Sequence, residues 1–247
     1  MIDSHAHLLP DFIKNINKII DNARTAGLEA VINSAIEPKH FQFAENLEKK
    51  NKGFIYTTLG FSPSWIKKLN FEKAYNSIRD SSSFIAVGEV GLDYHWIHDS
   101  FWKKKQQETF SKFIELANEL NKPLVIHSRK AETECLDILE QKAKVQVLLH
   151  CFAGNLAEAN RIVDLDWLIS VPTAVVNRKK HRKLARSVPL ENIVIETDSP
   201  FLSPIKGQKN EPAYLKYAAK EIAILKEIPY DEVDSITTRN TKEFYQI

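Results

Sequence analysis

Cysteine is scarce in this chain: only Cys135 and Cys151 occur among 247 residues. Two cysteines are too few for the disulfide framework of a small secreted protein, and this usage is typical of a reducing cytosol. Long apolar runs are also missing, so no segment approaches the about 18 residues that a membrane-spanning helix needs. The opening segment, MIDSHAHLLPDF, has no basic stretch followed by an apolar one, so we expect no secretory signal. We therefore expect a cytoplasmic protein with no membrane partner.

An excess of charge of either sign is absent as well. Lys and Arg together number 34, and Asp and Glu number 32, which gives a net charge of +2. So slight a basic excess does not by itself indicate a surface for nucleic acid. The hydrophobic content of 43% is ordinary for a globular protein, and the length is sufficient for a sizeable core. Since no linker, low-complexity segment or close repeat divides the chain, we expect one domain over residues 1–247.

Short apolar runs alternate with amphipathic stretches along the whole chain. The runs are rich in Val, Ile and Phe and are bounded by Pro, Gly, Asn or Asp, which is typical of buried strands. They cover residues 1–7, 29–35, 54–60, 84–91, 123–128, 145–152, 166–171 and 192–198. The clearest helical patterns cover 101–120, 131–143 and 211–228. This alternation predicts an α/β fold, a TIM-type (β/α)8 barrel with an extra C-terminal helix over 231–247 that packs on the outside. An open, doubly wound sheet is the alternative.

Ionisable side chains stand at the ends of several predicted strands. They are His5, His7, Glu89, His127, His150 and Asp198. Each has an ordinary explanation alone: a histidine at a strand end is usually a structural group, Glu89 could cap a helix, and Asp198 could form a turn. In a barrel, however, the carboxyl ends of the strands meet on one face, where barrel enzymes build their active sites. Imidazole and carboxylate groups gathered there predict a site for divalent metal ions.

The segment NIVIETDSPFL places two carboxylates, Glu196 and Asp198, directly after a buried apolar run. An ionised carboxylate is very costly to bury without a partner. Strand alternation predicts that Glu196 lies one layer deeper than Asp198, and that Asp3 lies one layer below His5. Because ligand imidazoles usually donate their second N–H to a carboxylate or carbonyl, we expect Asp198 to bind metal and Glu196 and Asp3 to support the histidines. The alternative is that Glu196 pairs with a buried Lys or Arg.

The candidate ligands are too many for a single catalytic ion that keeps an open position. A bridging carboxylate would let two ions share the site and clamp the attacking and leaving oxygens of a phosphoester. Glu89 stands in the sequence between the histidines of the first strand and those of the fifth and sixth. We therefore expect two divalent ions with Glu89 as the bridge.

With these residues in view, the chain resembles the TatD family of metal-dependent deoxyribonucleases, barrels of the amidohydrolase superfamily. The resemblance rests on the segments IDSHAHL, VGEVGLDY, LVIHSR, LLHCFAG, ETDSPFLSP and GQKNEPAYL, which span nearly the whole chain. It implies that His5, His7 and Asp198 hold one ion, that His127 and His150 hold the other, and that Glu89 bridges them. It also implies hydrolysis of phosphodiester bonds in DNA, commonly with Mg²⁺, with Zn²⁺ or Mn²⁺ as alternatives. Members of the family are linked to 3′-to-5′ exonuclease action and DNA repair.

Three departures from the family pattern bear on substrate preference. Ser62 stands in GFSP where the family commonly has a histidine, and Lys206 stands where it commonly has an arginine. The usual Tyr or Arg after GLDY is replaced by HWIH. A lysine supplies a point charge rather than the two-pronged contact of arginine, so phosphate binding should differ here.

The expected mechanism uses water that the ions acidify to a pKa of about 7. Asp198 would take its proton, and the phosphate would be held by Arg129, Lys206 and Lys209. The basic run at 177–186 either borders the same face or forms a solvated helix surface. The aromatic residues near the site either stack on the bases of single-stranded or terminal DNA or cover the core; they are Phe61, Trp65, Tyr94, Trp96 and Phe201.

Two other functions are compatible with the pattern. One is a superfamily hydrolase that acts on an amide, a lactone or another ester, such as an aminoacyl-tRNA bond. Relatives of that kind often bridge their ions with a carboxylated lysine, whereas Glu89 occupies this kind of position here, which favours the nuclease. The other is a non-catalytic barrel that binds nucleic acid or a partner, and such a protein would have no need for the full ligand set.

Overall fold

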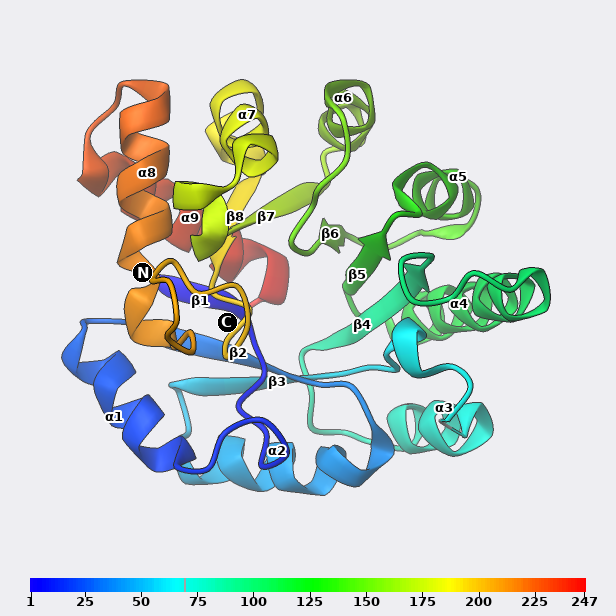
Figure 1. The fold of residues 1–247 in the computed structure, drawn as a ribbon. Helices are drawn as coiled ribbons and strands as arrows, with labels where there is room; N and C mark the ends of the chain where they lie inside the picture. Colours follow the sequence, from blue (N-terminus) through cyan, green and yellow to red (C-terminus); the bar gives the residue numbers. More distant parts are fainter. Residues whose placement is uncertain (69) are drawn as a thin grey trace.

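The computed structural model describes residues 1–68 and 70–247 and forms a parallel, eight-stranded barrel (Figure 1). Its strands are β1 (Ile2–Ala6), β2 (Ala30–Ala35), β3 (Ile55–Leu59), β4 (Ala86–Asp93), β5 (Leu124–Arg129), β6 (Val147–Leu149), β7 (Leu168–Pro172) and β8 (Ile193–Glu196). Each strand pairs in parallel with the next one along the chain. The predicted barrel is confirmed, and the doubly wound sheet is excluded because the strand order never reverses.

The seam between β8 and β1 is closed at the carboxyl ends of the two strands. The Asp198 N–H donates to the carbonyl of His5 at 2.9 Å, and the His7 N–H donates to the carbonyl of Ser199 at 2.7 Å. Ala6 and Ser199 also form a parallel bridge. The residues that follow β8 are therefore held directly beside the end of β1.

Helices surround the barrel in the order expected from the alternation (Figure 1). They are α1 (Ile16–Thr25), α2 (Pro38–Lys50), α3 (Phe71–Arg79), α4 (Ser100–Leu120), α5 (Glu132–Lys142), α6 (Leu156–Asp164), α7 (Lys179–Ser187), α8 (Lys216–Lys226) and α9 (Tyr230–Tyr245). The predicted helix at 211–228 is divided into a short 3₁₀ turn, Pro212–Tyr214, and α8. No helix in the described part of the chain combines the length and the apolar character needed to cross a membrane.

The extra helix α9 closes the amino end of the barrel rather than only covering its outside. It lies behind the strands in Figure 1, and its Phe244 and Tyr245 pack among apolar residues at the starts of the strands, including Ile2, Val125 and Val194. The Tyr245 hydroxyl donates to the backbone carbonyl of Ser4 at 2.9 Å. With this end filled, the carboxyl end is left for a polar site.

Candidate metal centre

The predicted ligands meet at the carboxyl end of the barrel and form a continuous row. In order along the row they are Asp198, His7, His5, Glu89, His150 and His127. Neighbouring ligand atoms are 3.4 Å apart from Asp198 to His7, 3.3 Å from His7 to His5, and 3.4 Å from His150 to His127. Five strands contribute, so only the folded barrel assembles the row.

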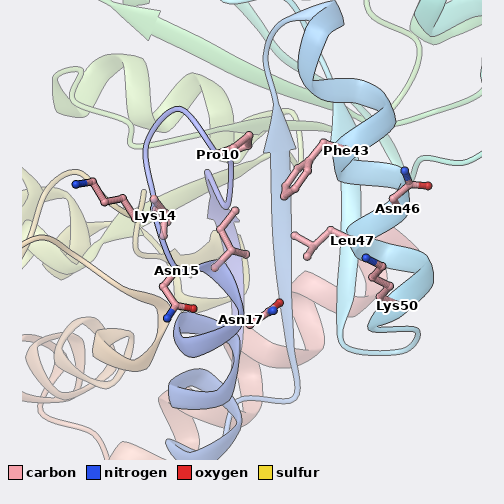
Figure 2. Close-up of a pocket in the computed structure, with 10 residues that line it drawn as sticks. Pro10, Lys14, Asn15, Asn17, Phe43, Asn46, Leu47 and Lys50 are labelled. Atoms are coloured by element: carbon pink, nitrogen blue, oxygen red, sulfur yellow. The ribbon is translucent and has the colours of Figure 1, made fainter.

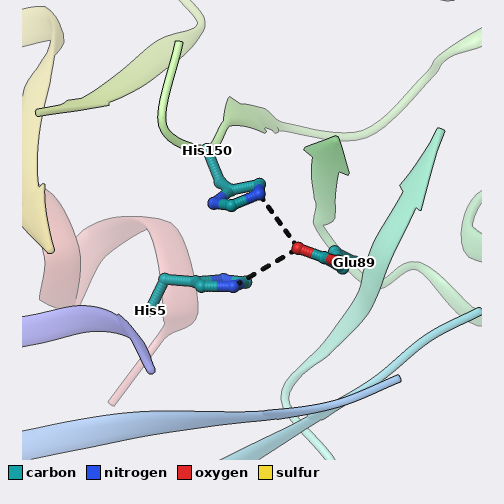
Figure 3. Close-up of side chains that lie close together, drawn as sticks. All are labelled: His5, Glu89 and His150. Carbon is teal, nitrogen blue, oxygen red and sulfur yellow. Dashed lines mark ion pairs between the residues drawn. The ribbon is translucent and has the colours of Figure 1, made fainter. Parts of the chain in front are cut away.

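Glu89 lies between His5 and His150 (Figure 3). Its Oε2 atom is 3.4 Å from Nε2 of His5, 2.9 Å from Nε2 of His150 and 3.9 Å from Nδ1 of His127. The rings of His5 and His150 are stacked with centroids 4.1 Å apart, and both present Nε2 to the same carboxylate oxygen. Glu89 thus contacts histidines from both halves of the site.

A bulge in β4 aims Glu89 into the barrel. The register with β5 shifts between Gly88 and Val90, and β4 continues to Asp93. The expectation that Glu89 ends the fourth strand was therefore wrong: the residue lies inside the strand at the irregular position. Bulges commonly re-aim a side chain next to an active site.

The backbone conformation at Asp198 also differs from the predicted one. The eighth strand ends at Glu196, and Asp198 has a φ of 56°, in the left-handed region. Strand alternation therefore does not operate at this residue. The turn directs the Asp198 carboxylate to His7, whose Nε2 is 3.4 Å from Oδ1, and leaves 13% of the Asp198 side chain exposed.

Glu196 occupies the supporting position beneath His150. Its Oε1 lies 3.6 Å from Nδ1 of His150, and its Oε2 accepts a hydrogen bond from the Ser170 hydroxyl. No Lys or Arg within residues 1–68 and 70–247 forms an ion pair with it, so the alternative partner is not found. The buried carboxylate is compensated by an imidazole and a hydroxyl.

Asp3 does not make the contact expected of it. The register of β1 with β2 shifts between Asp3 and Ala6, so the simple alternation with His5 is lost. The Asp3 carboxyl instead accepts hydrogen bonds from the N–H and the hydroxyl of Thr197, and from the N–H of His5 at 3.3 Å. Burial raises the pKa of Asp3 to about 8, although the hydrogen bonds from Thr197 and His5 lower it in part. The Asp3 carboxyl therefore lies between β1 and β8, where it binds Thr197, and it makes no hydrogen bond to the ring of His5.

Asp93 takes the supporting role that we had not predicted. Its Oδ2 is 3.0 Å from Nε2 of His127, which leaves Nδ1 of that ring for the centre. The carbonyl of Ser34 likewise lies 3.0 Å from Nδ1 of His7. The sequence contained a signal for this role, because Asp93 in GLDY is a carboxylate at the end of β4. It was missed because the strand extends two residues beyond the predicted end at residue 91. Outer partners of this kind fix the orientation of ligand rings.

The electrostatics of the site favour a bound positive charge. Burial alone would raise the pKa of Glu89, yet the surrounding histidines hold it well below the usual range. Burial would lower the pKa of His150, but the carboxylates of Glu196 and Glu89 raise it well above its ordinary value. Burial lowers the pKa of His5 to about 4, so this ring is neutral. Two buried carboxylates beside one imidazole therefore favour a positive charge at this point of the site.

The donor set fits divalent metal ions. Nε2 atoms of His5 and His7 face one another at 3.3 Å, and such a pair of nitrogens needs a proton or a cation between them. Two overlapping groups have ligand atoms close enough for a shared ion: His5, His7 and Asp198, and His5, Glu89 and His150. Mixed imidazole and carboxylate ligands suit Zn²⁺ and Mn²⁺, and carboxylate also suits Mg²⁺.

A pocket of about 170 Å³ opens beside His127, His150 and Asp198. Two guanidinium groups line it, those of Arg129 and Arg178. Within the basic run 177–186, Arg178 and His181 face this pocket, whereas four other members line an outer depression beside α8: Lys179, Arg182, Lys183 and Arg186. Of these residues, only Arg178 and His181 border the site. The other four lie on the outer side of α7.

The two predicted lysines differ from Arg129, which lines the pocket. Lys209 is exposed, and its Nζ donates to the carbonyl of Phe12 at 3.1 Å. Lys206 is also exposed, and within the described residues neither lysine lines the pocket. Ser62 is buried and pairs with the hydroxyl of Ser64 at 2.9 Å, so it does not extend toward the pocket as a phosphate ligand.

Two other features of the structure are weaker candidates for a metal site. A hollow of about 450 Å³ lies between the segment before α1 and the helix α2 (Figure 2), but its lining contains no histidine, cysteine or carboxylate. A second cluster joins Asp11, Glu37 and His40. There the Lys39 ammonium already lies 2.7 Å from Asp11 and 3.3 Å from Glu37, which balances the charge.

Comparison with known proteins identifies the family of this chain. Residues 2–246 match the family model described as TatD-related DNase. An uncharacterized metal-dependent hydrolase of Methanocaldococcus jannaschii is 39% identical over 249 residues, which cover 99% of this chain and 96% of that protein. The human deoxyribonuclease TATDN3 is 30% identical over 258 residues, covering 99% of this chain and 94% of the human protein.

A solved structure shows the same fold. The TatD homologue YjjV of Escherichia coli superposes with a TM-score of 0.89 at 26% identity, over 100% of this chain and 98% of that one. The expected resemblance is thus confirmed over nearly the whole length. The chain belongs to the TatD-related DNase family and is a metal-dependent hydrolase.

Proposed function

We propose that this protein is a deoxyribonuclease that hydrolyses phosphodiester bonds in DNA with a pair of divalent ions. The observation that carries the proposal is the contact of one carboxylate, Glu89, with histidines of three strands, beside a pocket lined by two arginines. The family description and the name of the human relative, deoxyribonuclease, support the choice of DNA.

The ligand roles follow the order of the row. His5, His7 and Asp198 would hold one ion, His127 and His150 would hold the other, and Glu89 would touch both. Divalent cations bound there would lower the pKa of water to about 7 and draw charge from the phosphoryl oxygens. Mg²⁺ is our choice for the working metal, with Mn²⁺ or Zn²⁺ as substitutes.

The protein's own groups supply the remaining steps. Asp198 lies at the open edge of the row, with 13% of its side chain exposed, so its carboxylate can accept the proton of the attacking water. As the water oxygen bonds to phosphorus, the bond to the leaving sugar oxygen breaks in line. Arg129 and Arg178 would hold the phosphoryl oxygens from the pocket side and balance the charge that develops on them.

The direction of cleavage and the form of the DNA substrate are further parts of the proposal. We infer 3′-to-5′ removal of nucleotides from single-stranded DNA or from duplex ends, as in the trimming of ends during repair. Lys209, tied to Phe12 beside His7, would extend the phosphate contacts along the strand, and the exposed Lys206 would add a further charge. Binding should weaken as salt rises, because phosphate contacts release counterions.

The deciding experiment is product analysis on end-labelled single- and double-stranded DNA, with Mg²⁺, Mn²⁺ or EDTA present. We expect a ladder that shortens from the 3′ end in either metal and no product in EDTA. Fragments cut from the interior would overturn the exonuclease mode alone. No DNA cleavage in any metal, with hydrolysis of an aminoacyl-tRNA or another ester instead, would overturn the assignment to nuclease.

A further inference from the structure

Exposed aromatic side chains are concentrated on the face that carries the metal centre. Within the described residues the large apolar side chains with high exposure are Trp96, Phe101, Leu165, Phe201 and Ile224. Two of the three aromatic residues follow a strand at its carboxyl end, Trp96 in the β4–α4 connection and Phe201 in the β8–α8 connection, whereas Phe101 lies in the first turn of α4. Exposed large apolar groups that gather beside a site indicate a binding surface rather than a core.

Trp96 is fixed to one end of the ligand row. The backbone N–H of Trp96 donates at 2.9 Å to Oδ1 of Asp93, and Oδ2 of the same carboxylate lies 3.0 Å from Nε2 of His127. The indole is 62% exposed, and the Arg129 guanidinium lies 5.7 Å from the ring centroid. The exposed indole, which has the His95 ring edge-on at 4.7 Å, therefore stands beside the guanidinium proposed to hold phosphate, and Asp93 links its backbone to His127.

Phe201 is fixed to the other end of the row. Its N–H donates at 2.8 Å to the carbonyl of Asp198, and its ring centroid is 6.0 Å from that of His7. Phe12 supports the ring in an edge-to-face contact at 5.5 Å, yet 46% of Phe201 remains exposed. The row of ligands runs from Asp198 to His127, so the two exposed rings flank it at opposite ends.

We propose that Trp96 and Phe201 are two base-stacking platforms, one on each side of the metal centre, that bind the unpaired bases next to the phosphate that is cut. The inference rests on the proposed nuclease function and names its substrate class as single-stranded DNA. Bases in a duplex already stack on one another, whereas an unpaired base has a free π-face for an aromatic side chain. Arg129 beside Trp96 supplies the phosphate contact that such a platform needs.

The test compares a thymidine oligonucleotide with an abasic strand of the same length, which keeps the phosphates and lacks the bases. For Trp96→Ala and Phe201→Ala we expect kcat/KM on the oligonucleotide to fall roughly 5- to 100-fold, the range of one lost stacking contact. Cleavage of the abasic strand should stay unchanged. Trp96→Phe and Phe201→Tyr, which keep a ring, should restore most of the loss.

Ile224→Ala is the matched control, because it removes an apolar side chain of 69% exposure from the outer helix α8. Variants that lose activity equally on both strands, or on neither, would overturn the stacking role. Binding of the same two strands by fluorescence anisotropy provides a readout that needs no cleavage. If the wild type cuts no DNA but still prefers the strand with bases, and the double variant loses that preference, the nuclease proposal fails while the platforms stand.

Discussion

The backbone of Gly60, just after β3, packs directly on the backbone of Glu89. A Cβ atom at residue 60 would lie 2.3 Å from the carbonyl oxygen of Glu89 and 2.4 Å from its nitrogen. The neighbouring Phe61 N–H also donates to that carbonyl at 3.0 Å. The end of β3 therefore fixes the bulge that carries the central carboxylate.

Gly60→Ala should displace Glu89 and weaken metal binding. The clash is with backbone rather than with a flexible side chain, so the bulge must move, at a cost of roughly 1–3 kcal/mol in unfolding free energy. Isothermal titration with Mn²⁺ and urea unfolding measure the two effects. Gly53→Ala is the control, because its φ of 79° imposes strain although a Cβ there meets nothing within 4 Å. Equal metal affinity in both variants would contradict the role of Gly60.

Glu89→Gln should abolish turnover while the barrel stays folded. The amide keeps the volume of the side chain but removes the charge that faces His5 and His150. We expect at least a ~100-fold loss of DNA cleavage, the upper limit for residues that only support a ligand. Glu37→Gln is a matched control, since Glu37 is equally buried but lies outside the row. A Glu89→Gln enzyme with full activity would remove this carboxylate from the centre.

Asp93→Asn should lower metal affinity without destroying the site. The amide can no longer accept from the His127 ring as a carboxylate does, and lost outer partners typically cost about 10- to 100-fold in affinity. Excess metal should restore activity. Asp99→Asn changes a carboxyl nearby that caps α4 through the Trp102 N–H at 3.1 Å, and it should leave affinity unchanged. If the two variants bind Mn²⁺ alike, Asp93 has no supporting role.

Metal binding should stabilise the fold, because the ligands come from five strands. At a concentration of about 100 times the Kd, one site adds about 2.7 kcal/mol. For a chain of this size that corresponds to a rise in Tm of roughly 5–10 °C. Scanning calorimetry in EDTA and in Mn²⁺ measures it. A Tm that is the same in both buffers would show that no ion is held by the row.

Tyr245→Phe should destabilise the barrel without touching the site. The buried hydroxyl donates to the Ser4 carbonyl at 2.9 Å, and its removal takes away this hydrogen bond, which costs roughly 0.5–1.5 kcal/mol. Tyr214→Phe is the control, because its hydroxyl bonds to Gln208 in an exposed position. Urea unfolding of the two variants measures the difference. Equal stabilities would mean that α9 does not secure the amino end of the barrel.

The sequence predicted the barrel because the apolar runs recur at a regular spacing and their bounds match the strands within a few residues. It also indicated which imidazole and carboxylate groups meet at one end of the barrel, since parallel strands bring their carboxyl ends together wherever they lie in the chain. The contact predicted for Asp3 was wrong, and the role of Asp93 was not predicted. Glu89 and Asp198 were expected at regular strand positions that they do not occupy. Register shifts in β1 and β4 and the left-handed turn at Asp198 decide these positions. Alternation along a strand assumes that such irregularities are absent.

The closure between β1 and β8 indicates where the barrel would open first if the metal were lost. His5 and His7 stand on one side of that junction and Asp198 on the other, so a cation shared by the three would cross-link the first and last strands. Removal of this ion by a chelator would leave the ends of β1 and β8 joined by backbone hydrogen bonds such as those of the His7 and Asp198 N–H groups. After chelation, hydrogen exchange should therefore become faster first at the backbone N–H groups of His7 and Asp198. Local opening of the barrel would then begin at the candidate metal centre.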